Sequence, residues 1–382
     1  MASKKVIPID TKDLDFEENE IRAIVKVMDR PTIILKTRES ESRAVSPSLK
    51  NENKKDDTAS CILTKPSSTF SSLLSWGPEM TYCIKFMNEH MQLCETVLDF
   101  LTDQQDFLVV GCVGLQGVGK SFVLTQLASS YKPNVFQTQQ MSHHENGSNC
   151  TSGIDFFVTR NRVIYLDTQP FLSGLVTDYS TYFEQKKNSG DYVINETTLE
   201  VQSLQFLAFM FSVCHVVILV QDWFVDPNLI RFLQAAEMLK PSSSTSMDQN
   251  YVEHYPHLVF LQNKGEAQDF EYDTIDMMSD FYEKTFASSR LQIHSGLNMK
   301  DELIKNELNL FILPLEKDLD ECPFYKDMEE QIDFLRRKLF GVTKRAMTPV
   351  PLTEKNWFHY ANKVLESIKK SHLASEYGRL LP

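Results

Sequence analysis

The sequence lacks the features of secreted, membrane-spanning and nucleic-acid-coating proteins. Its seven cysteines form no C-x-x-C pair, so we expect small core thiols in a reducing compartment. The first residues contain no apolar signal segment, and no run of about 18 apolar residues occurs, which predicts neither export nor membrane insertion. Basic residues are outnumbered, 39 against 52 acidic ones, and the net charge of −13 disfavours direct nucleic-acid binding. We therefore expect a cytoplasmic protein.

Residues 1–75 have few apolar residues and many Ser, Lys, Glu, Asp and Asn, which predicts a disordered arm. Two short apolar patches interrupt it, at 31–36 (PTIILK) and 61–66 (CILTKP). They are either chance clusters or short docking motifs for a partner. Residues 76–348 are expected to form one domain with a Ser-rich linker loop at 241–252, and residues 349–382 a C-terminal amphipathic helix.

A complete phosphate-binding pattern stands at residues 107–121, FLVVGCVGLQGVGKS. An apolar, β-prone run leads into the loop, and the following SFVLTQLAS predicts a helix that begins at the phosphates. Backbone N–H groups of such a loop cradle phosphates, while Lys120 would reach the β and γ oxygens and the Ser121 hydroxyl would bind Mg²⁺. The predicted loop contacts are Gly114, Gln116, Gly117, Val118, Gly119, Lys120, Ser121 and Phe122.

Apolar strands alternate with helical segments after this loop. Strands are predicted at 154–159, 162–167, 214–221, 257–264 and 309–315, and helices at 199–211, 227–239 and 270–286. This order predicts an α/β fold, a P-loop G-domain-like, doubly wound, mostly parallel sheet with its ligand beyond the carboxyl ends of the strands. The spacing of apolar residues from 80 to 101 predicts a further amphipathic helix.

A second apolar stripe follows the last predicted strand. It runs along a helix that Thr353 is expected to open. Its residues are Trp357, Tyr360, Ala361, Val364, Leu365 and Ile368. The stripe either packs on the domain itself or forms a partner surface.

Four residues complete the predicted nucleotide site. Asp167 ends an apolar strand, where a carboxylate can hold Mg²⁺ or its bound water. Thr151 stands where P-loop GTPases place a threonine on Mg²⁺ and the γ-phosphate, although a loop threonine with a local hydrogen bond is the alternative. Asn263 and Lys264 approximate the N-K-x-D base-reading motif, Asn263 tying loops together and the Lys264 stem covering the base. The predicted ligands are thus Mg²⁺, on Ser121, Thr151 and Asp167, and a purine nucleoside di- or triphosphate, either ATP or GTP.

Two departures from a GTPase concern hydrolysis and base choice. Pro170 replaces the glycine of D-x-x-G and has no N–H to donate to a γ-phosphate, and Phe171 replaces a water-orienting Gln. Glu266 stands where an aspartate would read guanine. These changes predict a pseudo-NTPase that binds a nucleotide without efficient turnover. The alternatives are an active P-loop NTPase switch, which needs a substitute for the missing N–H, and a small-molecule kinase, which needs an arginine-rich lid.

Five segments resemble the Smg-nine family of the nonsense-mediated mRNA decay kinase complex. They are TSGIDFF (151–157), LDTQP (166–170), CHVVILVQDWF (214–224), YPHLVFLQNK (255–264) and LTEKNWFHYA (352–361). The resemblance covers roughly residues 80–382. It implies a G-like domain without established turnover, a heterodimer with the Smg-eight subunit, and docking of that pair on the Smg-one kinase, which it restrains. It also carries Gly117, Gly119, Lys120 and Ser121 over as phosphate and Mg²⁺ contacts, while the base identity does not carry over.

Overall fold

The computed structural model describes residues 77–128, 134–141, 143, 149–173, 194–241, 252–299, 307–315, 326–372 and 376. The predicted arm, with its two apolar patches, and nearly all of the predicted linker loop lie outside these residues. No helix in the described part of the chain is long and apolar enough to cross a bilayer.

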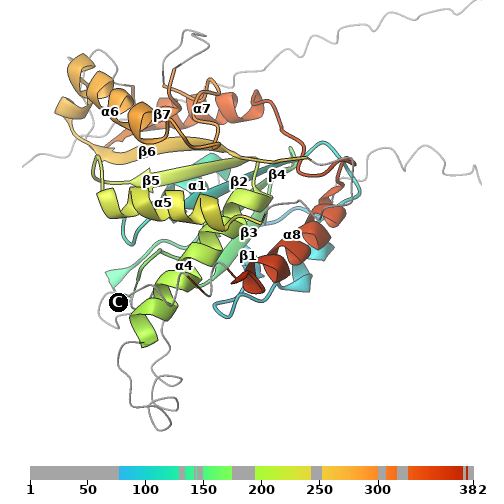
Figure 1. Cartoon of the computed structure of the whole chain (residues 1–382). Helices are drawn as coiled ribbons and strands as arrows, with labels where there is room; N and C mark the ends of the chain where they lie inside the picture. Colours follow the sequence, from blue (N-terminus) through green and yellow to red (C-terminus); the bar gives the residue numbers. More distant parts are fainter. Residues whose placement is uncertain are drawn as a thin grey trace, which may run out of the picture. The chain divides into compact units, whose positions relative to one another are not determined.

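The described residues form one seven-stranded sheet with the strand order β1-β3-β4-β2-β5-β6-β7 (Figure 1). The strands are β1 (Ile84–Met87), β2 (Leu108–Val113), β3 (Ile154–Val158), β4 (Val163–Thr168), β5 (Val216–Gln221), β6 (His257–Gly265) and β7 (Leu310–Pro314). The helices are α1 (Lys120–Ala128), α4 (Ile194–Val213), α5 (Pro227–Leu239), α6 (Tyr272–Thr285), α7 (Met328–Phe340) and α8 (Glu354–Lys369), with the short 3-10 helices η2 (Glu95–Asp99) and η4 (Ala267–Phe270).

The sheet is mostly parallel, as the alternation of strands and helices predicts. Strands β4, β2, β5, β6 and β7 pair in parallel in that order, whereas β3 runs antiparallel to both β4 and β1. The link from β3 to β4 is too short for a crossover helix, so these two strands can only form a hairpin. Every residue of β2, β4 and β5 is buried, which explains their unbroken apolar runs.

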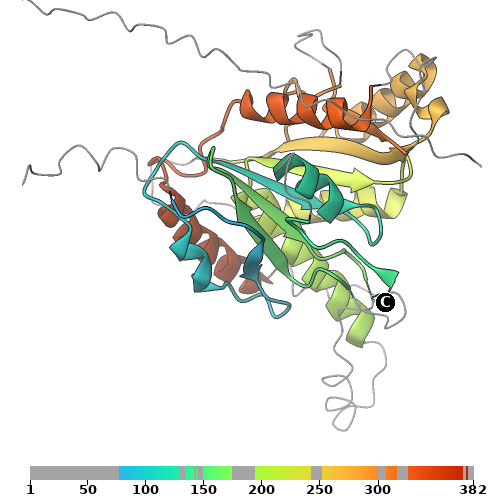
Figure 2. The same cartoon turned by 180° about the vertical axis from the view of Figure 1, so that it is seen from behind.

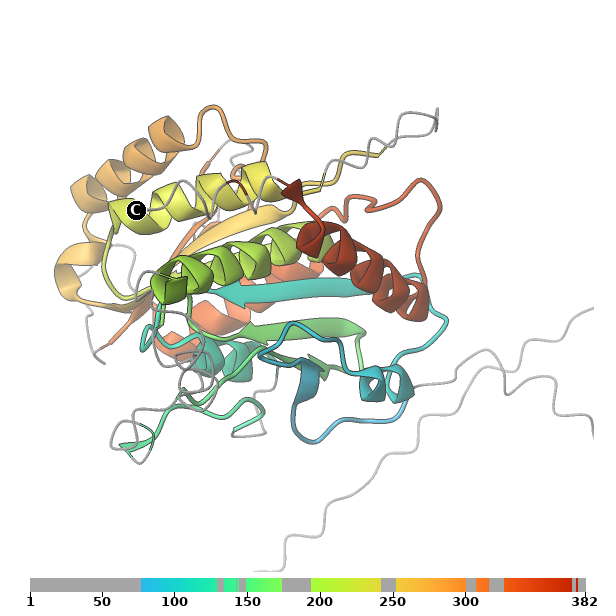
Figure 3. The same cartoon turned by 60° about the horizontal axis from the view of Figure 1, so that its bottom comes forward.

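Helices cover both faces of the sheet. Helices α1 and α7 lie together on one face (Figure 2). On the other face α8, α4 and α5 lie side by side (Figure 3). Helix α6 adjoins α5 and packs Tyr282 on Phe260 of β6, with ring centroids 4.0 Å apart. The result is a three-layer α/β arrangement.

The amphipathic helix predicted over residues 80–101 is wrong. That segment forms β1, a turn and η2. The Asn88 side-chain oxygen accepts hydrogen bonds from the backbone N–H groups of His90 (3.1 Å) and Gln92 (2.8 Å), and Met91 has a φ of 57°. An asparagine that bonds its own neighbours in this way favours a turn over a helix. The apolar residues at three-and-four spacing therefore belong to β1, η2 and the turns around them, not to one helix.

Helix α8 begins where Thr353 predicts, with the Thr353 side chain accepting from the Asn356 N–H at 3.2 Å. Its apolar stripe packs on α4 of the same domain. Trp357 is fully buried and donates its indole N–H to the carbonyl of Val213 at 2.8 Å. The Tyr360 hydroxyl donates to the carbonyl of Ser212 at 3.2 Å. The stripe is thus part of the domain's own core.

A buried ion pair fixes the start of α8 to the sheet. The Glu354 carboxylate has no exposed surface and accepts from the Arg162 guanidinium through both of its oxygens. The backbone N–H and hydroxyl of Thr102 donate to the same carboxylate at 2.6 and 2.8 Å. Every charge of the pair is therefore matched by hydrogen bonds, the condition under which a buried ion pair is tolerated.

We expect Glu354→Ala to lower the free energy of unfolding by about 3–5 kcal/mol, because it leaves the Arg162 guanidinium buried and unpaired. Lys355→Ala is the matched control, since Lys355 pairs with Asp103 on the surface and its loss should cost less than about 1 kcal/mol. Urea titrations of both variants measure the difference. Equal stabilities would show that the Arg162–Glu354 pair does not hold α8 in place.

Candidate functional site

The predicted phosphate loop connects the end of β2 to the start of α1. Gly119 has a φ of 96°, and a Cβ there would lie 2.3 Å from Nδ2 of Asn263. Gly117 also has a positive φ, 80°, but a Cβ there would meet nothing within 4 Å. Glycine adopts such angles without strain, and at Gly119 the side chain of Asn263 on β6 also needs the space. The pattern of glycines thus follows from the loop's shape.

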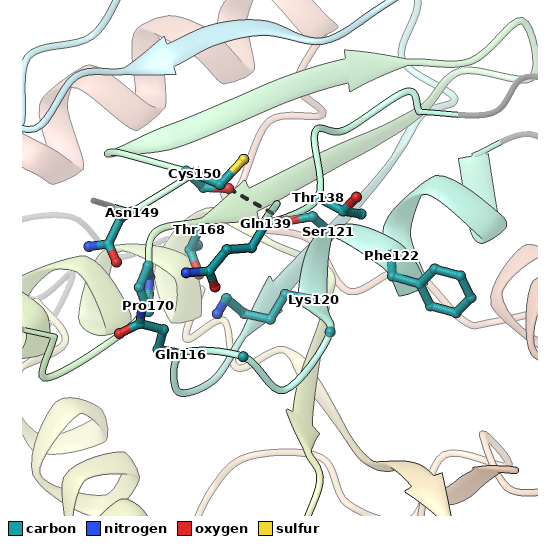
Figure 4. Close-up of a pocket in the computed structure, with 13 residues that line it drawn as sticks. Gln116, Lys120, Ser121, Phe122, Thr138, Gln139, Asn149, Cys150, Thr168 and Pro170 are labelled. Carbon is teal, nitrogen blue, oxygen red and sulfur yellow. Dashed lines mark hydrogen bonds between the residues drawn. The ribbon is translucent and has the colours of Figure 1, made fainter. Parts of the chain in front are cut away.

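The loop lies at a switch point in the sheet order. Strand β2 has β4 on one side and β5 on the other, and the chain leaves β2 through α1 on one face but joins β4 to β5 through α4 on the opposite face. In open α/β sheets such a point creates a crevice beyond the carboxyl ends of the strands, where ligands bind. A cavity of about 250 Å³ occupies this place (Figure 4). It is lined by Gln116, Gly117, Gly119, Lys120, Ser121, Phe122, Thr138, Gln139, Asn149, Cys150, Thr151, Thr168 and Pro170.

The three predicted magnesium residues come together at the cavity. Asp167 on β4 lies opposite Cys112 of β2, and its Oδ2 accepts from the hydroxyls of Ser121 (2.6 Å) and Thr151 (3.1 Å). The side chain is fully buried, and burial raises the pKa of Asp167 to about 6, although the hydrogen bond from Ser121 and the charge of Lys120 oppose the shift. Ser121, 46 positions before Asp167 in the chain, and Thr151, 16 positions before it, thus converge on one carboxylate.

These residues suit Mg²⁺ held jointly with phosphates. No group of three or more His, Cys, Asp or Glu side chains that could hold a metal ion occurs among the described residues, so an all-protein cage is not built there. Mg²⁺ needs no such cage, because it keeps several waters and binds through one or two carboxylates and substrate phosphates. The Oδ1 atom of Asp167 is buried without a hydrogen-bond partner, the condition of a carboxylate whose remaining ligand is a cation or its water.

Lys120 lies within the phosphate loop. Its side chain is buried, and its Nζ donates to the carbonyl of Leu115 at 2.8 Å. Burial lowers the pKa of Lys120 below its usual value, and the nearby carboxylate of Asp167 opposes this shift. An anion in the cavity would favour the charged ammonium further.

Asn263 and Lys264 tie the end of β6 to the same loop. Asn263 Nδ2 donates to the carbonyl of Val118 at 2.8 Å, the linking role that its motif predicts. Lys264 Nζ donates to the carbonyl of Gly117 at 3.0 Å and pairs with Asp222 at 3.1 Å. Glu266, by contrast, caps η4, where its side chain accepts from the backbone of Asp269. This carboxylate is therefore already engaged at the place where a GTPase reads guanine.

The predicted loop contacts do not all face the cavity. Gln116 and Phe122 line it, Phe122 with 37% of its surface exposed. The Val118 side chain is buried beneath the loop, and Gly114 lies behind it, against the carbonyl of Val220. Lys264 contacts the loop at the carbonyl of Gly117 and is not among the residues that line the cavity.

Phe171 points away from the cavity. Its ring is buried, and it packs against Phe232 of α5 with centroids 5.7 Å apart. A side chain in this position cannot orient a water molecule at a phosphate.

The backbone around Pro170 offers no substitute donor. Pro170 lines the cavity and has no N–H. The neighbouring N–H groups are used elsewhere: Gln169 donates to the carbonyl of Gly153 (2.8 Å), Phe171 to that of Gly114 (3.3 Å) and Leu172 to the Ser203 hydroxyl (3.3 Å). Residues 169–172 are thus fastened to their surroundings through these backbone groups.

Five residues that line the cavity were not predicted from the sequence motifs. They are Thr138, Gln139, Asn149, Cys150 and Thr168. Four of them belong to the connection between α1 and β3, which has no recognisable motif. Its polar, aperiodic composition was the available signal, since such a loop beside a P-loop faces the ligand. Composition alone does not say which of its side chains point inward.

We expect Gly119→Ala to lower the midpoint of thermal unfolding more than Gly117→Ala does. Both replace a glycine of positive φ, but only the Gly119 variant also brings a Cβ against Asn263. The backbone term alone is about 1–2 kcal/mol. Adding Asn263→Ala to each variant tests the contact, because it should recover part of the loss at Gly119 and none at Gly117. Equal recovery in both would contradict the contact.

Comparison with known proteins gives a consistent family. A family model described as Smg8_Smg9 matches residues 102–260, a span that contains the phosphate loop and Asp167. The nonsense-mediated mRNA decay factor SMG9 of Xenopus tropicalis is 37% identical over 393 residues, covering 92% of this chain and 77% of the relative. The corresponding factor of Xenopus laevis is 39% identical over 79% of this chain, and that of Caenorhabditis elegans is 24% identical over 79%. The chain belongs to the SMG9 family of nonsense-mediated mRNA decay factors.

Proposed function

We propose that this protein is a nucleotide-binding regulatory subunit of the kinase complex that acts in nonsense-mediated mRNA decay. In this proposal a G-like domain binds a purine nucleoside di- or triphosphate with Mg²⁺. It pairs with the Smg-eight subunit in the cytoplasm, and the pair restrains and targets the Smg-one kinase.

One observation carries the nucleotide part of the proposal: Ser121 of the P-loop and Thr151 line one cavity at the switch point of the sheet, and both hydroxyls donate to the buried carboxylate of Asp167. Phosphate binding needs a loop of backbone N–H groups, a lysine and a metal-binding hydroxyl, and the cavity presents all three. The link of Asn263 and Lys264 to the loop supports the G-like assignment.

The same geometry favours binding without turnover. When bound, Mg²⁺ would neutralise charge on the phosphates, with Ser121, Thr151 and Asp167 as its protein ligands. Attack by water additionally needs a group that orients the water and donors for the charge that develops. Phe171 faces the core, and the N–H groups beside Pro170 are already bonded. We therefore propose a pseudo-NTPase whose turnover is no faster than the roughly 10⁻⁴ per second of an unassisted Ras-type site.

The geometry indicates where the phosphates would bind but does not distinguish adenine from guanine. Glu266 serves as a cap of η4, so guanine selection through this carboxylate would require the cap to open. Both ATP and GTP therefore stay within the proposal.

Three exposed apolar side chains support a partner at the ligand edge of the sheet. Trp223 follows β5, Tyr272 begins α6 after β6, and Leu315 follows β7, so all three lie at the carboxyl ends of neighbouring parallel strands. Trp223 is 77% exposed, and the other two are more than half exposed. Exposed aromatic residues gathered at one edge mark interaction surfaces.

The first expected outcome concerns the nucleotide. Wild-type protein should release a purine nucleotide on denaturation, or gain thermal stability when Mg²⁺ and ATP or GTP are added, because a ligand stabilises the folded state by mass action. Lys120→Ala should abolish both effects, whereas Lys264→Ala, which keeps the cavity lysine, should retain some binding.

Single-turnover assays on the loaded protein should show no phosphate release within minutes. Melting unaffected by nucleotide would contradict the site, and rapid release that Lys120→Ala removes would contradict the pseudo-enzyme assignment.

The second expected outcome concerns the partner. Co-expression with the Smg-eight subunit should give a one-to-one complex by size exclusion with light scattering. Trp223→Ala should weaken it about tenfold or more, as removal of a central aromatic anchor does. Met238→Ala is the matched control, because Met238 is 74% exposed on α5, away from that edge. A monodisperse monomer that ignores Smg-eight would disprove the pairing, and equal affinity of the two variants would disprove the edge.

A further inference from the structure

Two side-chain amides in the cavity wall have no hydrogen-bond partner. They are the Nε2 group of Gln139 and the Nδ2 group of Asn149, and each nitrogen atom is buried. Buried amide N–H groups in folded proteins are nearly always paired, because leaving one unpaired costs the whole of its lost hydration. Two such donors on one cavity therefore point to a ligand that accepts hydrogen bonds.

The two amides lie among the residues that would surround the outer phosphates. They line the same cavity as Lys120, Thr168 and Pro170, and the side chains of Gln139 and Lys120 lie next to one another in it (Figure 4). In a P-loop site the lysine reaches the β and γ oxygens. An acceptor within reach of both Lys120 and these amides is thus an anion at the outer end of a polyphosphate.

The amide oxygen of Asn149 faces the Ser173 hydroxyl. The Ser173 hydroxyl lies 3.3 Å from Oδ1 of Asn149 and 3.2 Å from Oε1 of Gln116, yet it has a single proton to donate. When Gln116 turns its NH₂ group toward Ser173, that proton goes to Asn149 Oδ1, and Asn149 Nδ2 is left directed at the cavity. This arrangement satisfies all three side chains and leaves a donor for the ligand.

We propose that Gln139 and Asn149 donate hydrogen bonds to the terminal phosphate of a nucleoside triphosphate, in place of the N–H that Pro170 lacks. The inference rests on the proposed nucleotide function and adds the ligand contacts that would distinguish a triphosphate from a diphosphate. These two amides would hold the terminal phosphate in place of the missing N–H. Slow turnover then rests on Phe171, which faces the core and cannot orient an attacking water.

Isosteric variants of the full chain test this inference. Gln139→Glu and Asn149→Asp each keep the shape of the side chain but replace the donor by an oxygen that repels phosphate. Gln137→Glu is the matched control, since Gln137 is exposed on the same segment and receives the same change of charge. Isothermal titration in Mg²⁺ would use ATP, ADP, GTP, GDP and inorganic tripolyphosphate. Gln139→Ala and Asn149→Ala remove the donors without adding charge, in case the acidic variants do not fold.

We expect each cavity variant to weaken binding of the triphosphates and tripolyphosphate about tenfold or more, and binding of the diphosphates much less. The control should bind within about twofold of wild type. If wild type binds none of the five ligands, the proposed nucleotide function itself is wrong. If wild type binds but folded cavity variants bind triphosphate equally well, the site stands and the donor assignment is wrong. Equal losses for tri- and diphosphates would also overturn the assignment to the terminal phosphate.

Discussion

The parallel pairing of β2 with β4 is the constraint on which the site depends. It sets Cys112 opposite Asp167, so that the phosphate loop leaving β2 and the carboxylate ending β4 meet at one edge of the sheet. The Thr168 hydroxyl reinforces this register by donating to the carbonyl of Cys112 at 2.8 Å. A slip by one residue would turn Asp167 to the other face of the sheet. The hairpin of β3 and β4 constrains this register. The Arg162–Glu354 ion pair does so too, because Arg162 immediately precedes β4.

The phosphate loop and helix α1 are both fixed by side chains that bond to their backbone carbonyls. Asn263 and Lys264 occupy backbone carbonyls of the phosphate loop, which leaves its N–H groups for a ligand. Helix α1 is supported at its C-terminal end, where Arg336 of α7 donates to the carbonyls of Leu127 and Gln126. Cations at the C-terminal end of a helix satisfy its last carbonyls. Asn263 and Lys264 thus hold the loop, and Arg336 holds the helix that follows it. None of the three lines the cavity.

The sequence predicted the α/β fold with a mostly parallel sheet, because each strand gave a strong local signal. Glycine spacing gave the loop, and the fully buried strands gave unbroken apolar runs that admit few alternatives. Residues 80–101 were mispredicted because periodicity cannot separate one helix from a strand and a turn, and Asn88 was the overlooked sign. Gln139 and Asn149 were missed for another reason: their buried amide N–H groups have no partner in the fold, which only three-dimensional packing reveals.

The fastening of the segment after β4 has a consequence for signalling. In GTPase switches the corresponding segment is released or ordered according to the third phosphate. Here the N–H groups of Gln169 and Phe171 bond to the carbonyls of Gly153 and Gly114, so residues 169–171 are held by the protein's own backbone. These residues need no third phosphate to order them. With the proposed nucleotide bound, they would form a fixed wall of the site, arranged alike around a diphosphate and a triphosphate, and any difference between the two ligands would be carried by other residues.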